Sequence, residues 1–438
     1  MQARLQLAIQ TIETLRHAGH AAFLVGGCVR DRLLAIQPKD FDIATSAPPP
    51  EIARLFSKSY LVGAHFGVSL LVESAGVEVE IATFRSEGEY SDGRRPDEVA
   101  FVTNPALDAC RRDFTINGLF EDPLSHEVLD YVGGQADLRQ KVIRAIGEPE
   151  RRFHEDHLRM LRAIRFASRL GFSLELKTLE AIRSQAGRIV RISPERIREE
   201  LVRILTEGNA RYGLELLESS GLLAHLLPEV RAFQGVEQPP EYHPEGDVWT
   251  HVLMMLEQMR KPVPTLALGV LLHDVGKPPT FRVADRIRFD GHAEVGATMS
   301  EAILARLKFS NEDTAQITSL VANHMKFKDI TKMRTSTLKR FLRLSHFEEH
   351  LELHRLDCLC SNGRTDSYEF ARMKLAEFAQ EQLHPPGLIS GTDLIAAGYK
   401  PGPKFKQALS AVETAQLEGE LSTKEQAMAL AMDWMDRH

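Results

Sequence analysis

Two aspartates, Asp40 and Asp42, stand one residue apart in the stretch KDFDIAT, shortly after the glycine pair Gly26–Gly27. Alternate residues of a β-strand point to the same face, so we expect both carboxylates on one side of a strand. Two like charges so close repel each other, and a bound cation makes their arrangement favourable. Taken alone, the D-x-D pair is also typical of a solvated strand end.

A third acid is available nearby. Glu78 and Glu80 alternate in the same way in GVEVEIATFR, and one of them could join the aspartates from a neighbouring strand. Three carboxylates suit Mg²⁺, which prefers carboxylates together with substrate phosphates. Two such ions could activate a hydroxyl and neutralise a leaving pyrophosphate in an in-line displacement. Backbone N–H groups at Gly26 and Gly27 can approach a triphosphate closely, and Arg30 adds positive charge.

The strands that must hold these residues lie in the first third of the chain. AAFLVGG, SYLVGAHFGVSLLVES and GVEVEIATFR are apolar or alternating and are bounded by glycine and serine. After about Glu148 the pattern changes to long helical runs, with predicted helix starts at Ser193 and Ser310. The predicted fold class is α+β, with a β-containing head followed by all-helical segments.

Composition limits the classes of protein that the chain can belong to. The 438 residues suffice for roughly three domains. The net charge of −7 means that a nucleic acid must be met by local basic patches. No apolar run approaches the ~20 residues that span a bilayer, and the four cysteines have neither disulfide-framework nor zinc-finger spacing. We therefore expect a cytoplasmic protein without a membrane partner; its oligomeric state is unknown from the sequence.

Five motifs occur in one order at compact spacing: LVGGCVRDRLL, KDFDIAT, EIATFR, RRDFTINGLF and EDHLRMLRAIRFA. This order resembles the class II tRNA nucleotidyltransferase / bacterial poly(A) polymerase family over roughly the first half of the chain. The resemblance implies a template-independent polymerase whose head contains a small mixed β-sheet. It further implies that Asp40 and Asp42 hold the catalytic metals, and that Glu80 rather than Glu78 is the third acid.

A polymerase without a template must recognise the base with its own side chains. Asp156 can accept a hydrogen bond from an exocyclic amino group, and Arg159 can donate to a ring nitrogen or carbonyl. Being three apart, they are predicted to share one face of a helix and to accept both C and A. The resemblance assigns this pair that role; an exposed ion pair is the alternative. Further nucleotide-binding candidates are Arg112, Asp113 and Asn117, which the resemblance puts nearer the sugar and triphosphate, and Arg162.

Two other segments could contact RNA or the nucleotide. The polar stretch SEGEYSDGRRPDEVAF resembles a flexible loop that helps family members switch from C to A, and its Arg94 and Arg95 could touch phosphates. Arg165 and Arg196 belong to a stretch rich in arginine, which favours bidentate phosphate contacts, and are candidate RNA-binding residues. Some of these arginines must instead pair with neighbouring glutamates.

A second set of candidate residues lies in the middle of the chain. It matches the HD phosphohydrolase pattern H…HD…H…H…D with His251, His273, Asp274, His292, His324 and Asp357. Imidazole and carboxylate ligands suit a divalent metal, of uncertain identity, that activates water on a phosphoester. In members of the tRNA nucleotidyltransferase family that carry such a domain, phosphatase and 2′,3′-cyclic phosphodiesterase activities fit repair of RNA 3′ ends.

The C-terminal stretch KPGPKFK places Lys400, Lys404 and Lys406 near a predicted helix start, where they could bind RNA phosphates or simply be solvated. We therefore predict four domains: a nucleotidyltransferase head over 1–147, a helical neck with nucleotide recognition and RNA contacts over 148–228, an HD domain over 229–365 and a helical, tRNA-binding tail over 366–438.

The leading hypothesis is an enzyme that adds C and A to the tRNA 3′ end from CTP and ATP. An enzyme that adds only A and a poly(A) polymerase are alternatives; VGAHFGVSLL lacks the basic stretch of poly(A) polymerases, and the tail is not strongly basic. From a different class, the chain could be an HD phosphohydrolase whose head binds RNA. The acids Asp40, Asp42 and Glu80 argue against that alternative.

Overall fold

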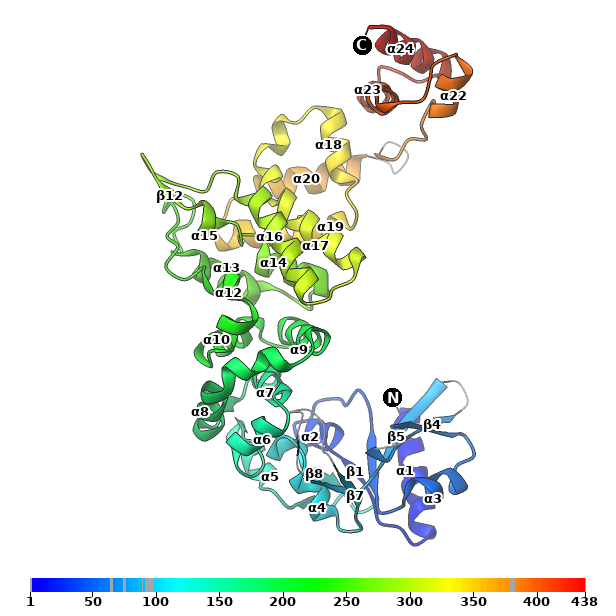
Figure 1. The fold of residues 1–438 in the computed structure, drawn as a ribbon, viewed down its shortest axis with the longest axis vertical. Coiled ribbons are helices and arrows are strands. Elements are labelled where there is room, and N and C mark those ends of the chain that lie inside the picture. Colours follow the sequence, from blue (N-terminus) through cyan, green and yellow to red (C-terminus); the bar gives the residue numbers. More distant parts are fainter. Residues whose placement is uncertain are drawn as a thin grey trace. The chain divides into compact units, whose positions relative to one another are not determined.

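The computed structural model describes residues 2–63, 66–73, 76–88, 90, 98–378 and 383–437. The chain divides into two compact units, Met1–Arg231 and Ala232–His438 (Figure 1). The break falls close to the predicted boundary between neck and HD domain, while the four predicted domains stay predictions. Within the described residues, no helix is long and apolar enough to cross a membrane. The predicted cytoplasmic location is not tested by this finding.

A mixed β-sheet organises the first half of the N-terminal unit. Among the described residues it has seven strands in the order β3-β4-β5-β2-β1-β8-β9. The strands are β1 (Ala22–Val25), β2 (Asp42–Thr45), β3 (Ser59–Gly63), β4 (Val68–Glu73), β5 (Val77–Thr83), β8 (Leu119–Glu121) and β9 (Val128–Asp130). β2 and β5 run parallel, and the other neighbouring pairs run antiparallel. The predicted α+β class with a small mixed sheet is therefore confirmed.

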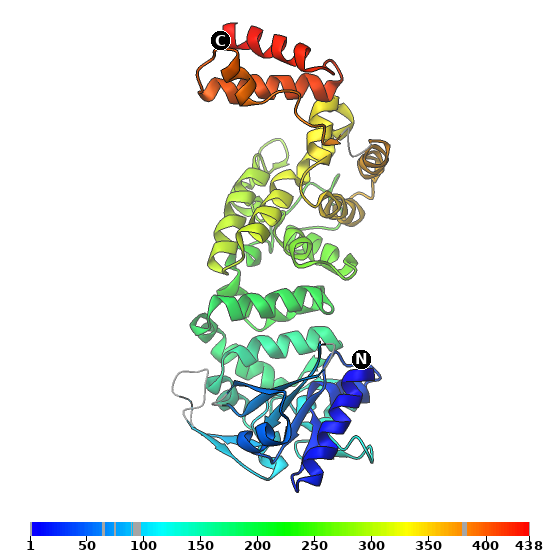
Figure 2. The same cartoon turned by 90° about the vertical axis from the view of Figure 1, so that its right-hand side faces the viewer.

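Apolar side chains on the strands and next to them form a core beside the sheet. Val25, Ala44, Phe84, Ala109 and Phe120 form one buried cluster. α1 (Gln2–His17) contacts β1, β2 and β5 and so covers one part of the sheet (Figure 2). The shorter strand pairs are β6 (Arg85–Glu87) with β7 (Val99–Phe101), and β10 (Val142–Ile143) with β11 (Ser173–Leu174).

The remaining helices of the N-terminal unit follow the turn chemistry of their sequences. Ser193 precedes α9 and Pro194 opens it, which confirms that predicted helix start. The helices are α2 (Gly27–Leu33), α3 (Pro49–Leu55), α4 (Pro105–Cys110), η3 (Thr115–Asn117), α5 (Gly134–Gln140), α6 (Pro149–Glu155), α7 (Leu158–Leu170), α8 (Leu176–Gln185), η4 (Ala186–Arg191), α9 (Pro194–Thr206), α10 (Ala210–Ser219), α11 (Leu222–Leu226) and α12 (Pro228–Arg231). α7 packs against both α9 and α10.

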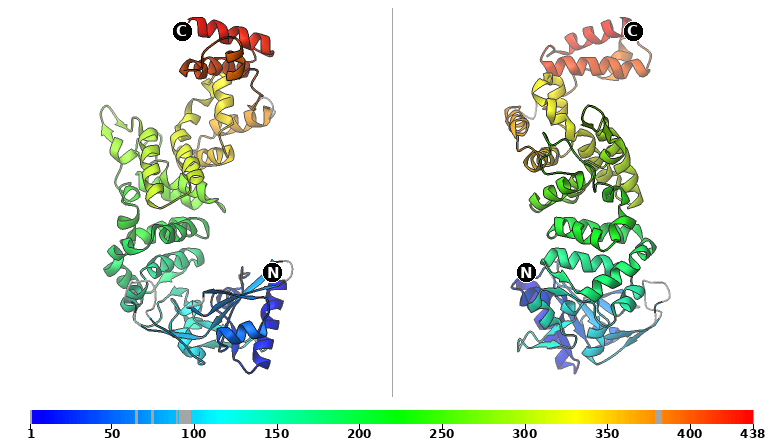
Figure 3. Two further views of the ribbon diagram at one scale, coloured as in Figure 1. Left: turned by 45° about the vertical axis from the view of Figure 1, so that its right-hand side comes forward. Right: turned by 90° about the vertical axis from the view of Figure 1, so that its left-hand side faces the viewer.

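The C-terminal unit is almost entirely helical. Ser310 caps α17 by accepting a hydrogen bond from the Asp313 N–H, as its predicted helix start requires. The elements are α13 (Val248–Gln258), α14 (Pro264–Leu272), α15 (Lys277–Thr280), β12 (Arg282–Val283), β13 (Ile287–Arg288), α16 (His292–Arg306), α17 (Asn311–Asn323), η5 (His324–Lys332), α18 (Thr335–Leu342), α19 (Phe347–Cys360), α20 (Asp366–Glu377), α22 (Gly391–Ala396), α23 (Pro403–Glu418) and α24 (Lys424–Arg437). α14 and α16 both pack against α17, and Figure 3 shows these helices in green to yellow. The last three helices enclose a separate core of Ile389, Leu394, Phe405, Val412, Ala427 and Ala431.

Candidate functional site

The glycine pair forms the turn between β1 and α2. Gly26 has a φ of +76°, a conformation that favours glycine, and a Cβ there would lie 3.1 Å from an Arg112 guanidinium nitrogen. Gly27 begins α2, which places Arg30 one turn along that helix. A side chain at Gly26 would therefore crowd Arg112, while the predicted approach of this backbone to a triphosphate stays a prediction.

The acids meet across two parallel strands. Asp42 is the first residue of β2 and stands directly opposite Glu80 on β5, whereas Glu78 pairs with Val72 on the other side of β5. This register favours Glu80 over Glu78 as the third acid. The prediction that Asp40 lies within the strand was wrong: β2 begins at Asp42, and Asp40 is mostly exposed and bonded to Arg4 at 3.0 Å.

Electrostatics at Asp42 fit a cation. Burial, and next the carboxylates of Glu80 and Asp40, raise the pKa of Asp42 to about 6, although Arg112 opposes them. A positive ion among these oxygens would relieve the repulsion. Carboxylate oxygens are the ligands that Mg²⁺ prefers, so Asp42 and Glu80 are of the right type for the predicted ion, whereas Asp40 is bonded to Arg4 and is not gathered with them.

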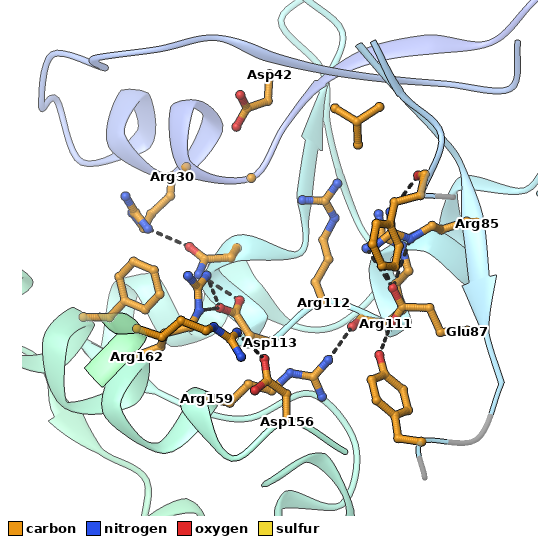
Figure 4. A pocket seen from close by; sticks show the side chains of 18 residues that line it. Arg30, Asp42, Arg85, Glu87, Arg111, Arg112, Asp113, Asp156, Arg159 and Arg162 are labelled. Carbon is orange, nitrogen blue, oxygen red and sulfur yellow. Dashed lines mark hydrogen bonds and ion pairs between the residues drawn. The ribbon is translucent and has the colours of Figure 1, made fainter. Parts of the chain in front are cut away.

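A cavity of about 720 Å³, here called the head pocket, contains most of the predicted nucleotide site. Its lining includes Gly26, Gly27, Arg30, Asp42, Arg112, Asp113, Asn117, Asp156, Arg159, Arg162 and Arg196. Figure 4 shows Asp42 on one side of the head pocket and Asp156 with Arg159 on the other. A single cavity thus joins the metal-type acid to the predicted base-recognising pair.

A continuous row of hydrogen bonds forms one wall of the head pocket. Arg30 donates to Asp31 at 2.8 Å and to Asn117 Oδ1 at 2.6 Å. Asn117 Nδ2 donates to Asp113 at 3.0 Å, and Arg162 donates to the other Asp113 oxygen at 2.9 and 2.6 Å. Burial alone would raise the pKa of Asp113, but Arg162 and Asn117 hold it well below its usual range. These hydrogen bonds hold the guanidinium groups of Arg30 and Arg162 in place, and both groups stay positively charged.

The predicted geometry of the base-recognising pair was wrong. Asp156 and Arg159 do not share a helix face, because α6 ends at Glu155 and α7 begins at Leu158. Asp156 is extended, caps the Leu158 N–H at 3.0 Å and pairs with Arg196 at 3.3 Å. Both residues nevertheless line the head pocket.

Arg159 is oriented by Glu155, whose role here was not predicted from the sequence. Its Nη1 donates to Glu155 Oε2 at 2.8 Å and to the Arg152 carbonyl at 3.1 Å. Arg152 also bonds to Glu155 and donates to the backbone carbonyls of Arg111 and Arg112. Glu155 thus links α6 to the base-recognising arginine; its place in EDHLR was the available signal.

Three further residues of the head pocket were not predicted: Arg85, Glu87 and Tyr90, all from the stretch after β5. Arg85 donates to Glu87 at 2.8 Å, and Glu87 accepts from the Tyr90 hydroxyl. The Arg159 guanidinium lies 6.0 Å from the centre of the Tyr90 ring. Arg85 closes the motif EIATFR, which was a signal for it. Arg94 and Arg95 of the predicted loop lie outside the described residues.

The predicted RNA contacts have different outcomes. Arg165 is only 4% exposed and donates to Glu200 at 2.6 Å, so its predicted role as an RNA-binding residue is wrong. Arg196 faces the head pocket through its bond to Asp156. Lys400, Lys404 and Lys406 are exposed around the start of α23, as a phosphate contact requires.

The six residues of the HD pattern come together in the C-terminal unit and are here called the HD cluster. His251 Nε2 lies 3.3 Å from Asp357, and His273 Nε2 lies 3.1 Å from Asp274. Asp274 Oδ1 lies 3.7 Å from His292 Nε2 and 3.8 Å from His324 Nε2. The predicted grouping of these ligand types is therefore present in the fold.

Unsatisfied ligand atoms make the HD cluster fit a metal. His251 Nε2, His273 Nε2 and both Asp274 oxygens are buried and make ion pairs within the cluster or with Lys277, but no hydrogen bond of standard geometry. Burial and then His273 lower the pKa of His324 to about 3, which keeps the imidazole in its metal-binding neutral form. The six residues fall into two groups of close donor atoms: His251 with His273 and Asp357, and Asp274 with His292 and His324.

Lys277 and Gln238, which were not predicted from the sequence, also reach the HD cluster. Lys277 Nζ lies 2.7 Å from Asp274 and donates to Gln238 at 2.6 Å. Burial alone would raise the pKa of Asp274, but His273 and Lys277 hold it well below its usual range. Lys277 follows the His-Asp pair in LLHDVGK, which was the signal for it.

Known families match three stretches of the chain. The models are the poly A polymerase head domain over residues 22–144, the probable RNA and SrmB-binding site of polymerase A over 171–234, and the putative tRNA nucleotidyltransferase domain 2 over 292–431. The CCA-adding enzyme of Lactobacillus helveticus is 42% identical over 258 residues, which are 57% of this chain and 63% of that protein. The one of Levilactobacillus brevis is 45% identical over 219 residues, 50% of this chain and 54% of that protein. The chain thus matches less than two thirds of these relatives.

Solved structures match over nearly the whole chain. The Bacillus stearothermophilus CCA-adding enzyme in complex with CTP has a TM-score of 0.75 and 27% identity, covering 100% of this chain and 98% of that one. The Thermotoga maritima CCA-adding enzyme complexed with tRNA has a TM-score of 0.58 and 19% identity, with coverages of 98% and 95%, which is evidence for the fold alone. The pocket, the motif order and the matched domains agree: the chain is similar both to poly A polymerase head domains and to tRNA nucleotidyltransferase domain 2.

Proposed function

We propose that the protein is a template-independent nucleotidyltransferase that adds C and A to the 3′ end of tRNA, using CTP and ATP. The observation that carries the proposal is the head pocket, which joins Asp42 to Asp156 and Arg159 in one cavity. The names of the similar proteins, several of them CCA-adding enzymes, support the same activity.

The reaction is a single in-line displacement. The terminal 3′ hydroxyl oxygen of the RNA attacks the α-phosphorus, the bond to the bridging oxygen breaks, and pyrophosphate leaves with that electron pair. A divalent cation, Mg²⁺ in this proposal, held by Asp40, Asp42 and Glu80 would activate the hydroxyl and neutralise the charge on the phosphates. The backbone of the Gly26–Gly27 turn and the guanidinium of Arg30 bind the triphosphate.

Base choice is assigned to the other side of the head pocket. The Asp156 carboxylate accepts from the exocyclic amino group that both cytosine and adenine carry. Arg159, held by Glu155, donates to a ring nitrogen or carbonyl. Uracil and the guanine edge lack that amino donor in the same place, so they leave Asp156 without a partner, which costs binding energy.

Transcripts of tRNA that end at the discriminator base, at C or at CC separate the possible activities. The protein is incubated with Mg²⁺ and one labelled nucleotide at a time. Addition of C, C and A followed by a stop supports the proposal. Addition of A to the CC transcript alone would make the protein an A-adding enzyme, and long A tails on any RNA would make it a poly(A) polymerase.

We infer a second activity, metal-dependent phosphoester hydrolysis, from the HD cluster. Six ligand-type side chains converge there, and four of the atoms that could bind a metal make no hydrogen bond of standard geometry. A divalent metal bound there would activate water for attack on a phosphoester. Lys277, held by Gln238, supplies a positive charge beside the cluster.

RNA 3′ ends are the substrates that link this activity to the first one. The test offers RNA ending in a 2′,3′-cyclic phosphate or a 3′-phosphate to the full-length protein with Ni²⁺, Mn²⁺ or Mg²⁺. Release of phosphate or ring opening that D274N abolishes supports the hydrolase. Equal rates for the wild-type protein and D274N with all three ions would contradict it.

A further inference from the structure

Four histidines contribute to the HD cluster, and three of them are oriented by the backbone. A carbonyl three residues earlier accepts from Nδ1 in each case, at 2.9 Å for His273, 2.8 Å for His292 and 2.6 Å for His324. A carbonyl oxygen can only accept, so the proton must lie on Nδ1 and the Nε2 lone pair faces the cluster. The backbone therefore selects the metal-binding tautomer at these three positions.

His251 cannot use that device because it lies inside a helix. It is the fourth residue of α13, where carbonyl groups are used by helical N–H groups. Its Nδ1 instead lies 2.7 Å from Glu245 Oε1. Both side chains are buried, with 0% of His251 and 4% of Glu245 exposed.

We propose that Glu245 is the positioning residue of the HD cluster. It holds the proton on His251 Nδ1 and thereby directs Nε2 toward Asp357, 3.3 Å away. A carboxylate that accepts from a ligand histidine fixes the ring and increases its basicity as a ligand. This inference rests on the second proposed function, because it concerns the metal that the HD cluster would hold.

The group formed by His243, Glu245 and His251 could be taken for a metal site of its own. Its distances favour hydrogen bonds: both imidazoles approach the same Glu245 oxygen, at 2.9 Å from His243 Nδ1 and 2.7 Å from His251 Nδ1. Donor atoms that share one ion at about 2.0–2.2 Å lie roughly 3 Å or more apart. Glu245 is thus an acceptor of two N–H groups.

The segment that carries Glu245 is itself anchored. Asp247 accepts from the Thr250 N–H at 2.9 Å and from the Gly235 N–H at 2.8 Å, which ties both ends of the segment. Gln238, near its middle, accepts from Lys277 at 2.6 Å. Glu245 therefore meets His251 from a position fixed by the fold.

The experiment measures Co²⁺ binding to full-length protein stripped of metal, by titration calorimetry and by the visible absorption of the bound ion. We expect E245A to weaken Co²⁺ affinity by about 10- to 100-fold and to change the absorption bands. E245Q should lose less, because the amide oxygen still accepts from His251. The matched control is E241Q, an exposed glutamate of the same segment, which should bind Co²⁺ as the wild type does.

The outcomes separate this inference from the function on which it rests. E245A that binds Co²⁺ with wild-type affinity and bands would overturn the positioning role and leave the metal site intact. Wild-type protein that binds no Co²⁺ would overturn both. If E245A does not fold, judged by its thermal unfolding, E245M decides, because it has a similar volume but no acceptor for His251: an affinity equal to that of E241Q would contradict the proposal.

Discussion

The head pocket and the HD cluster both gather charged side chains, but they satisfy them differently. The lining of the head pocket includes seven arginines and four acids, and most of these groups are already paired within the protein. The HD cluster combines four imidazoles with two carboxylates and leaves donor atoms buried without standard hydrogen-bond partners.

This difference indicates what each region binds. Paired arginines in excess over acids are suited to an anion, because fixed guanidinium groups meet phosphate oxygens without reorganisation. Buried imidazole nitrogens and carboxylate oxygens gathered at one point are suited to a cation, because a positive ion can accept lone pairs from both kinds of atom. We therefore expect the nucleotide to bind in the head pocket and a metal ion to bind tightly in the HD cluster.

The largest losses of activity and of metal binding should come from replacing one acid in each region by its amide. D42N removes a negative ligand opposite Glu80, and we expect nucleotide addition to fall by on the order of 10³-fold. D274N should leave nucleotide addition unchanged and abolish metal binding in the HD cluster. Single-turnover incorporation of labelled CTP and the metal content of purified protein measure the two effects. A D42N protein that keeps its activity would break the division between the regions.

Substitution of Asp156 should next relax the choice of base. D156N replaces a pure acceptor by an amide, and we expect the preference for CTP and ATP over UTP and GTP to fall by about 10- to 100-fold. The ratio of kcat/KM among the four nucleotides measures it. E180Q, on the exposed part of α8, is the control. An unchanged preference in D156N would assign base recognition to other residues.

Much of this arrangement followed from local sequence signals. Ser193 and Ser310 mark helix starts because a serine before a helix is a favoured cap. Local alternation of apolar and polar residues was enough to place Asp42 and Glu80 on strands. The pairing of β2 with β5 then puts the two acids opposite each other. The grouping of the HD residues followed from the family pattern rather than from spacing, since His251 and Asp357 are far apart in the chain.

Two kinds of feature could not be predicted from the sequence: a helix break where local signals disagree, and the burial of a side chain by tertiary packing. The apolar periodicity around Leu158 suggested one helix, but the Asp156 side chain caps the Leu158 N–H and breaks it. Arg165 resembles its arginine neighbours in sequence, yet only the packing of α7 on α9 shows that Glu200 neutralises it. Glu245 carries no local signal because its partner His251 lies on the next helix.

A moderate effect is expected from breaking the wall of the head pocket. N117A removes the amide that joins Arg30 to Asp113, leaving a guanidinium nitrogen and a carboxylate oxygen without this partner. We expect KM for CTP and ATP to rise about tenfold, equivalent to about 1.4 kcal/mol. Steady-state kinetics measure it, and thermal unfolding separates it from loss of folded protein. An unchanged KM would mean that Arg30 needs no support from Asn117.

The smallest expected effect is the change in thermal stability when the bound metal ion is removed. A ligand at 100 times its Kd stabilises a protein by about 2.7 kcal/mol, so stripping a bound ion with a chelator should lower the Tm by about 5 °C. D42N should show the same shift as the wild type, because its HD cluster is intact. D274N should show none, since its cluster no longer holds the ion. Lys277 limits the loss in metal-free protein, because its ammonium lies 2.7 Å from Asp274 and partly neutralises the carboxylate that the ion would bind. Equal shifts in D42N and D274N would mean that the stabilising ion is bound outside the HD cluster.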